Sequence, residues 1–191
     1  MTMEKLRGDM TAFVNSLYEE ERKVLVFGEG SVGAPVMMIG EAPGEQESLQ
    51  GRPFVGKAGK NLDELLELSG IDRGELYITN AVKFRPTKRS AAGNWVNRAP
   101  TREEVELFLP FLKRELQLVG PELIVTLGNT PLKALLGPKA TIGEVHGRML
   151  QWGETALYPL YHPASLIYNR SLRPVYEADV RRLGEWMRNG Q

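Results

Sequence analysis

Four residues that can bind a flat ring or activate water stand out in the sequence. Glu41 comes directly after "VMMIG", Asn80 ends "LYITN", and His162 ends "ALYPLYH". Phe54 lies in a segment made mostly of Gly, Pro and polar residues. A carboxylate can orient water, an aromatic face can stack on a ring, and carboxamide and imidazole groups can hydrogen-bond its edge. Together these residue types suit hydrolysis at a bound heterocycle.

The carboxamide of Asn80 can distinguish one pyrimidine from another. Uracil donates from N3–H to the amide oxygen and accepts at O4 from the amide nitrogen. Cytosine presents the opposite pattern, so a rigidly held Asn80 would leave buried groups unpaired and reject it. Uracil is therefore the base that fits this set of groups.

Each of these residues also has an ordinary structural explanation. The segment "GEAPGEQE", with Glu41, Glu45 and Glu47, is typical of a solvated acidic loop. Phe54 suits a small core contact, Asn80 a turn, and the histidine of "YHPASL" a satisfied structural position. Their joint placement after apolar strands favours a binding site over four separate structural roles.

The segments that position these residues alternate between helical and strand-like patterns. Thr101 and Glu104 have the spacing of a capping box, whereas Pro110 should bend or break its helix. The alternation predicts a mainly parallel sheet covered by helices on both faces, with ligands bound beyond the carboxyl ends of its strands. Helices are expected over 2–18, 58–70, 101–120, 129–137 and about 174–187, and strands over 23–27, 36–40, 76–80, 122–128 and 156–162.

Composition places limits on the class of protein. The 191 residues predict a single domain, 1–191, and no apolar run approaches the roughly 20 residues of a membrane helix. The absence of cysteine excludes disulfides and thiolate metal ligands, and it suits a cytoplasmic protein. The 24 basic and 24 acidic residues cancel, but the placement of charge matters more for nucleic-acid binding than its sum.

The sequence "GEGSVG" over residues 28–33 is a literal G-x-G-x-x-G motif. A dinucleotide site needs a helix directly after such a motif, so that the phosphate meets the helix N-terminus. Pro35 and the apolar segment 36–40 follow instead. We therefore predict a turn between two strands and no nucleotide site here.

An ordered set of motifs resembles the uracil-DNA glycosylase superfamily, most closely its family-4 enzymes. The motifs are "VFGEG", "GEAPGEQE", "GRPFVGKAGKNL", "YITNAVKFRP", "RAPT", "IVTLG" and "YHPASL". The resemblance implies an α/β fold of three layers, α/β/α, with a central four-stranded, mainly parallel sheet. It implies hydrolysis of the N-glycosidic bond of deoxyuridine in DNA after the base has been flipped out. It also implies that Phe54 stacks on uracil, Asn80 reads its edge, and His162 contacts O2.

The first-loop motif departs from the superfamily pattern at two positions. Ala42, beside the base, stands where the best-known members have Asp, and Ser48 replaces a common Asp. The carboxylate that orients water and stabilises the cationic sugar must therefore be Glu41 or Glu47. The sequence does not choose between them.

Family-4 enzymes usually hold a four-iron, four-sulfur cluster on four cysteines. The matching positions here are Phe13, Ser16, Phe84 and Phe108. These side chains cannot replace thiolates, so we expect no cluster, no metal and no other cofactor. The rings are expected to pack together, because a void of that size would be costly.

DNA is the expected partner, and its contacts are expected from two segments. The candidates are Arg85, Lys88, Arg89, Arg98, Ser165, Leu166 and Arg170. Cationic side chains bind phosphates, and Leu166 matches the residue that fills the gap left by a flipped base. The ordinary alternatives are a solvated loop and a core leucine.

We expect a monomeric, monofunctional enzyme, because no lysine stands in a recognised motif as an amine nucleophile. One alternative is a glycosylase for another deaminated base, such as hypoxanthine or xanthine. Another is a non-catalytic DNA-binding member of the superfamily. The joint presence of Glu41, Phe54, Asn80 and His162 argues against the second alternative.

Overall fold

Four strands lie side by side in the centre of the computed structural model, which describes residues 2–189. β1 (Val36–Gly40) pairs in parallel with β2 (Leu76–Asn80) and with β5 (Leu123–Leu127), and β5 pairs in parallel with β7 (Thr155–Leu160). A fifth strand, β6 (Leu150–Trp152), runs antiparallel along β7. The mainly parallel sheet is confirmed, but the expected four strands are five. The three residues of β6 are too few to produce a periodic signal in the sequence.

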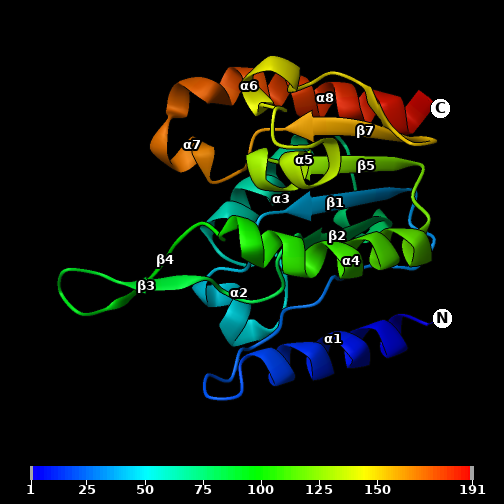
Figure 1. Ribbon diagram of the computed structural model, residues 1–191. Coiled ribbons are helices and arrows are strands. Elements are labelled where there is room, and N and C mark those ends of the chain that lie inside the picture. The colour runs from blue at the N-terminus through cyan, green and yellow to red at the C-terminus, as the bar shows by residue number, and fades with distance from the viewer. Residues whose placement is uncertain (1, 190–191) are drawn as a thin grey trace.

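Helices cover both faces of the sheet (Figure 1). α3 (Lys57–Leu68) and α8 (Arg173–Asn189) pack on one face, while α4 (Arg102–Val119) and α5 (Asn129–Leu136) pack on the other. Successive strand residues alternate between the two cores, as their period of two requires, so all five residues of β1 are buried. The predicted three-layer α/β/α arrangement is therefore confirmed.

Thr2 is the N-cap of the N-terminal helix α1 (Met3–Leu17), and its hydroxyl accepts a hydrogen bond from the Lys5 N–H. Two of the three buried side chains of α1, Met10 and Val14, join Phe84 and Phe108 in a third apolar cluster. No helix within residues 2–189 has the length and apolar character needed to cross a membrane.

The segment 23–27 does not form the expected strand. Leu25 makes one isolated bridge to Phe84, and Val24 is 57% exposed. The segment therefore has neither the continuous pairing nor the burial of a strand inside the sheet. Residues 28–33 lead into β1 and not into a helix, so the helix that a dinucleotide motif needs is missing there, but the predicted turn between two strands is wrong because the first strand does not form.

The capping box of α4 is confirmed, since Thr101 and Glu104 exchange both hydrogen bonds. α4 nevertheless continues through Pro110, so the expected break is wrong. Pro110 lies on the exposed side of the helix, where water can bind the carbonyl that it leaves free.

The sequence patterns did not predict several short elements. These are α2 (Glu45–Gln50), η1 (Arg73–Glu75), β3 (Thr87–Arg89), β4 (Trp95–Asn97), α6 (Ile142–Val145), α7 (Ser165–Tyr168) and η2 (Arg170–Leu172).

Candidate active site

The carboxyl ends of the parallel strands bring the predicted ring-binding residues together. Asn80 is the last residue of β2, whereas His162 lies two residues beyond β7 and not at its end. A Cβ atom on Gly40 would come within 2.5 Å of Phe54 Cζ and still closer to Asn80 Oδ1. The Phe54 and His162 ring centroids are 5.9 Å apart. Because Gly40 has no side chain, the aromatic ring and the carboxamide can meet over the end of β1.

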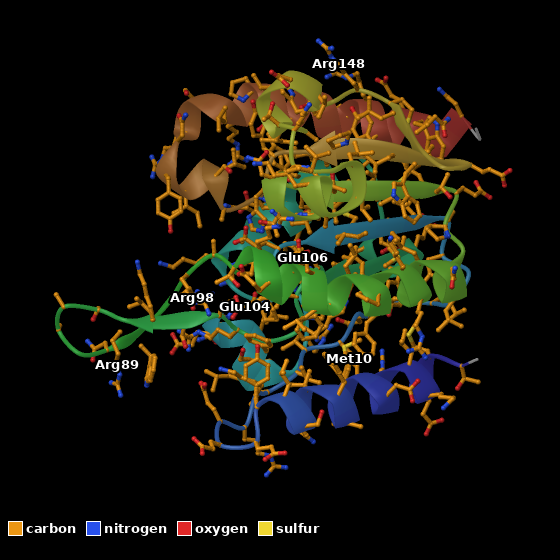
Figure 2. All side chains as sticks on the ribbon, viewed as in Figure 1. Met10, Arg89, Arg98, Glu104, Glu106 and Arg148 are labelled. Carbon is orange, nitrogen blue, oxygen red and sulfur yellow. The ribbon has the colours of Figure 1, made fainter. Side chains whose placement is uncertain are left out.

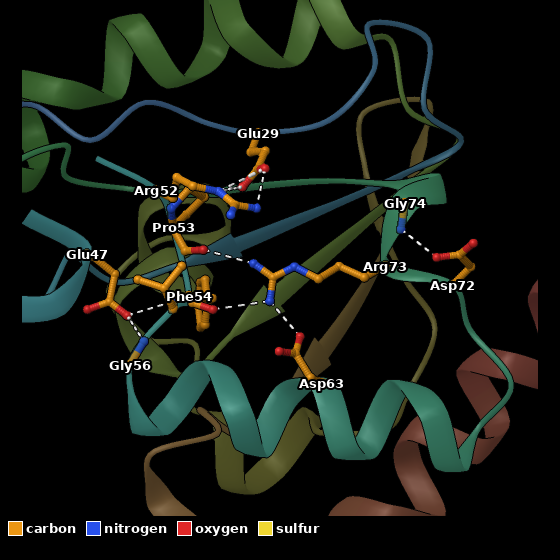
Figure 3. A network of polar contacts seen from close by, with 11 residues as sticks. Glu29, Glu47, Arg52, Pro53, Phe54, Gly56, Asp63, Asp72, Arg73 and Gly74 are labelled. Carbon is orange, nitrogen blue, oxygen red and sulfur yellow. Dashed lines mark hydrogen bonds and ion pairs between the residues drawn. The ribbon is translucent and has the colours of Figure 1, made fainter. Parts of the chain in front are cut away.

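Phe54 has φ 53°, the only positive φ outside glycine among residues 2–189. A side chain in this left-handed region costs conformational energy that the surroundings must offset. Arg73 supplies much of this hold, because its guanidinium donates to the carbonyls of Pro53 at 2.9 Å and Phe54 at 3.1 Å. Asp63 fixes that guanidinium at 2.6 Å, as Figure 3 shows.

The buried carboxylate of Glu47 clamps the same loop from the other side (Figure 3). Its Oε1 accepts from the main-chain N–H groups of Val55 at 3.0 Å and Gly56 at 2.7 Å. Its Oε2 accepts from the N–H of Gly44 at 3.2 Å. Both oxygens are therefore committed to holding the Phe54 loop against the first motif.

Glu41 is placed differently from Glu47. It is partly exposed, and its Oε2 accepts a hydrogen bond from the Thr130 hydroxyl of α5. Its other oxygen has no protein partner among residues 2–189, so it is open to a water molecule. Thr130 was not predicted as a site residue, and its only sequence signal is its position shortly after β5. Ala42 packs beside the third apolar cluster.

The geometry around His162 selects one form of its ring. Nδ1 accepts a hydrogen bond from the Ala164 N–H at 3.1 Å, so Nδ1 carries no proton and Nε2 carries it. Burial lowers the pKa of His162 to about 4, an effect that the nearby Glu47 carboxylate opposes. At neutral pH His162 is therefore an uncharged donor through Nε2–H.

The expected basic loop 85–98 is a hairpin of β3 and β4 that projects beyond the strand ends (Figures 1 and 2). Lys88 and Arg89 are exposed on it. The Arg89 guanidinium lies over the Trp95 ring at 4.2 Å, and Trp95 is 53% exposed. This tip presents both positive charge and an aromatic face.

Two other arginines of the hairpin are engaged within the protein. Arg98 makes two 2.7 Å bonds to the Glu104 carboxylate (Figure 2) and also donates to the Thr87 carbonyl. Arg85 donates to Asn97 Oδ1 at 2.6 Å. These contacts anchor the hairpin, and Lys88 and Arg89 are its exposed charges, with Arg89 also donating to the Gly93 carbonyl within the tip.

The segment after His162 forms α7. Leu166 is 7% exposed and belongs to the main core, so a contact with DNA would need it to leave that core. Tyr168 is 88% exposed, Ser165 is partly exposed, and Arg170 is exposed.

The four positions that match cluster cysteines do not provide a metal site. Phe84 and Phe108 are 1% exposed and pack edge to face with centroids 5.7 Å apart, while Phe13 packs on Phe111 at 5.3 Å. Ser16 is exposed, and its hydroxyl donates to the Phe13 carbonyl. Within residues 2–189 no group of three or more His, Cys, Asp or Glu could hold a metal ion. The expected packing of the rings is confirmed, and these side chains do not fit an iron–sulfur cluster.

A hollow of about 460 Å³ lies at the opposite edge of the sheet, between residues 31–36, residues 70–75 and the end of α8. Its lining includes Glu75, Trp186 and Arg188 but no Asn or His. The groups that can read a base therefore gather at the carboxyl edge and not in this hollow.

Comparisons with known proteins show which family the chain resembles in sequence and in fold. The type-4 uracil-DNA glycosylase of Sulfurisphaera tokodaii is 35% identical over 193 residues, which cover 96% of this chain and 84% of that protein. The type-4 uracil-DNA glycosylase of Thermotoga maritima is 40% identical, with 84% and 82% covered. The crystal structure of wild-type Pedobacter heparinus SMUG2 shares the fold, with a TM-score of 0.57 at 14% identity over 94% of this chain and 82% of that one.

The sequence model of the uracil DNA glycosylase superfamily matches residues 27–183. That match spans the strand ends, the Phe54 loop and the His162 segment described above. The chain belongs to the uracil DNA glycosylase superfamily.

Proposed function

We propose that the protein is a uracil-DNA glycosylase that hydrolyses the N-glycosidic bond of deoxyuridine in DNA. The observation that carries this proposal is that the Phe54 ring and the Asn80 carboxamide meet over Gly40, with the His162 ring 5.9 Å from that of Phe54. The relatives at 35% and 40% identity are named for this activity. A stacked base cannot reach buried groups of this kind, so the deoxyuridine is flipped out of the helix.

Asn80 reads the Watson–Crick edge of the flipped uracil, and Phe54 stacks on its face. Asn80 is 3% exposed and its backbone is fixed, since Lys83 Nζ donates to its carbonyl at 2.7 Å. Lys83 is fully buried and also pairs with Glu115 at 2.6 Å. Rigid placement gives the amide its power to reject cytosine. The same burial withholds the Lys83 amine from the sugar, in keeping with a monofunctional enzyme.

Glu41 and His162 carry the chemistry. A water molecule held by the open oxygen of Glu41 adds to C1′ as the C1′–N1 bond breaks, and Glu41 takes the proton of that water. The uracil leaves as an anion, and the Nε2–H of His162 donates to its O2. Glu47 keeps the Phe54 loop in place. No step requires an iron–sulfur cluster, and we propose that the enzyme has no cofactor.

The DNA lies across the carboxyl edge, between the hairpin and α7. Lys88, Arg89 and Arg170 bind phosphates, and Tyr168 is better exposed than Leu166 to contact the bases. Arg85 and Arg98 hold the hairpin. We further propose that the chain acts as a single-domain monomer in the cytoplasm.

The direct test is uracil release from labelled oligonucleotides. The wild type should release uracil, whereas Asn80→Ala should lose about 2 kcal/mol of transition-state stabilisation, or about 30-fold in rate, because the pyrimidine edge loses its reader. Oligonucleotides with hypoxanthine or xanthine are the control substrates. Faster release of either purine than of uracil, or no release at all, would overturn the proposal.

The pH dependence should reflect the neutral form of His162. Because its folded-state pKa is about 4 and its ordinary value is 6.5, the folded protein keeps the ring neutral where the unfolded chain would bind a proton. Stability linked to this group is thus lost as pH falls from 6.5 toward 4. The single-turnover rate should stay level between pH 8 and 6. A decline centred near 6.5 would show that His162 titrates normally.

Neutralising the hairpin tip should weaken DNA binding without regard to the target base. Lys88→Gln with Arg89→Gln should make the slope of log affinity against log salt shallower by about two units, because two phosphate contacts are lost. Lys113→Gln with Arg181→Gln removes equal charge from exposed sites on α4 and α8 and is the matched control. Equal slopes in both double variants would place the DNA elsewhere.

A further inference from the structure

A second histidine, His146, packs against Tyr161, the residue before His162, and has no part in the proposed chemistry. It follows α6, and its Nδ1 lies 2.7 Å from Oδ2 of Asp179 on α8. The Asp179 side chain is 1% exposed, and Arg182 donates to its other oxygen. A buried carboxylate with two partners is a fixed point, because leaving either oxygen unpaired is costly. Asp179 therefore holds the His146 ring in one place.

The His146 ring stacks on Tyr161, the residue directly before His162. The two ring centroids are 4.7 Å apart with a tilt of 36°. The turn that permits this contact is built around Gly147, which has φ +66° and whose Cβ position would collide with Asp179 Oδ1. The Gly147 N–H also donates to the Pro159 carbonyl at 2.8 Å. The arrangement thus requires glycine at this position and ties the turn to β7.

The stack matters because the sheet no longer supports the chain at this point. β7 ends at Leu160, whose carbonyl accepts from Gly128 N–H as the last bond across to the end of β5. Beyond it, His162 accepts local hydrogen bonds from the N–H groups of Ala164 and Ser165. Two long-range contacts flank His162: the His146–Tyr161 stack before it, and the bond from Asn61 Nδ2 to the Pro163 carbonyl at 3.1 Å after it.

We propose that His146 is a positioning residue, which holds Tyr161 against the Asp179 anchor and thereby aims the Nε2–H of His162 at the leaving base. This inference rests on the proposed function for its catalytic meaning. It concerns the ring orientation of His162 and is measurable without substrate.

The test uses the fact that the chain has only two histidines. Proton–nitrogen correlation spectra of the free protein report which ring nitrogen of His162 carries the proton. Wild type should show the single Nε2–H form. His146→Ala should blur that signature and lower the single-turnover rate by about 10- to 100-fold at saturating DNA, with affinity for product DNA unchanged, because a misaligned donor is costly.

Two further variants separate positioning from general loosening of the fold. His146→Phe keeps a ring on Tyr161 without the Asp179 bond and should restore only part of the signature and rate, because the ring is no longer tied to Asp179. Arg182→Gln removes the other partner of Asp179 but leaves the stack, so it should lower thermal stability and spare the rate. An unchanged His162 signature in His146→Ala, or an equal rate loss in Arg182→Gln, would overturn the inference. A wild type that releases no uracil, with the signature still sensitive to His146, would instead refute the proposed function alone.

Discussion

The site depends on one buried carboxylate, that of Glu47, which accepts hydrogen bonds from three main-chain N–H groups. These bonds fasten the loop after β1 to the start of α3, and between them Phe54 is held with a backbone conformation that a side chain rarely adopts. Arg73 completes the hold from the opposite side. Because hydrogen bonds to a charged acceptor are about twice as strong as neutral ones, they can offset the strain at Phe54. The ring is thus in place before any base arrives.

The remaining groups are prepared in the same way. The Ala164 N–H sets the proton of His162 on Nε2, and Thr130 fixes one oxygen of Glu41 while the other stays open. Lys83 fixes the carbonyl of Asn80. Preorganised donors of this kind lower the reorganisation that charge development would otherwise demand. Aromatic rings stand at three of the four positions that the resemblance matches to cluster cysteines, and the apolar contacts of Phe84 and Phe108 join α4 to the segment after β2.

The sequence was sufficient for the parallel sheet and for the residues at its carboxyl edge, because buried strands and the residue types that follow them leave a strong local pattern. It failed where a role depends on partners distant along the chain. The sequence does not distinguish the roles of Glu41 and Glu47. They differ in their contacts, because Glu41 bonds to Thr130 and Glu47 bonds to the Phe54 loop. Arg98 has the residue type of a phosphate ligand, and its sequence carries no sign of its two bonds to Glu104. Short elements such as β6 are stabilised by neighbours and carry no periodicity.

We propose that Glu41 is the reacting carboxylate and that Glu47 is the supporting one. Single-turnover uracil release and melting temperature measured together on Glu41→Gln and Glu47→Gln test it most directly. Glu41→Gln should lower the rate by about 10²-fold or more and leave the melting temperature unchanged, because it removes the group that receives the proton. Glu47→Gln should lower both, with a melting temperature reduced by about 2–4 °C for each kcal/mol lost. The division of roles would be wrong if Glu47→Gln melted like the wild type but lost all activity while Glu41→Gln stayed nearly active.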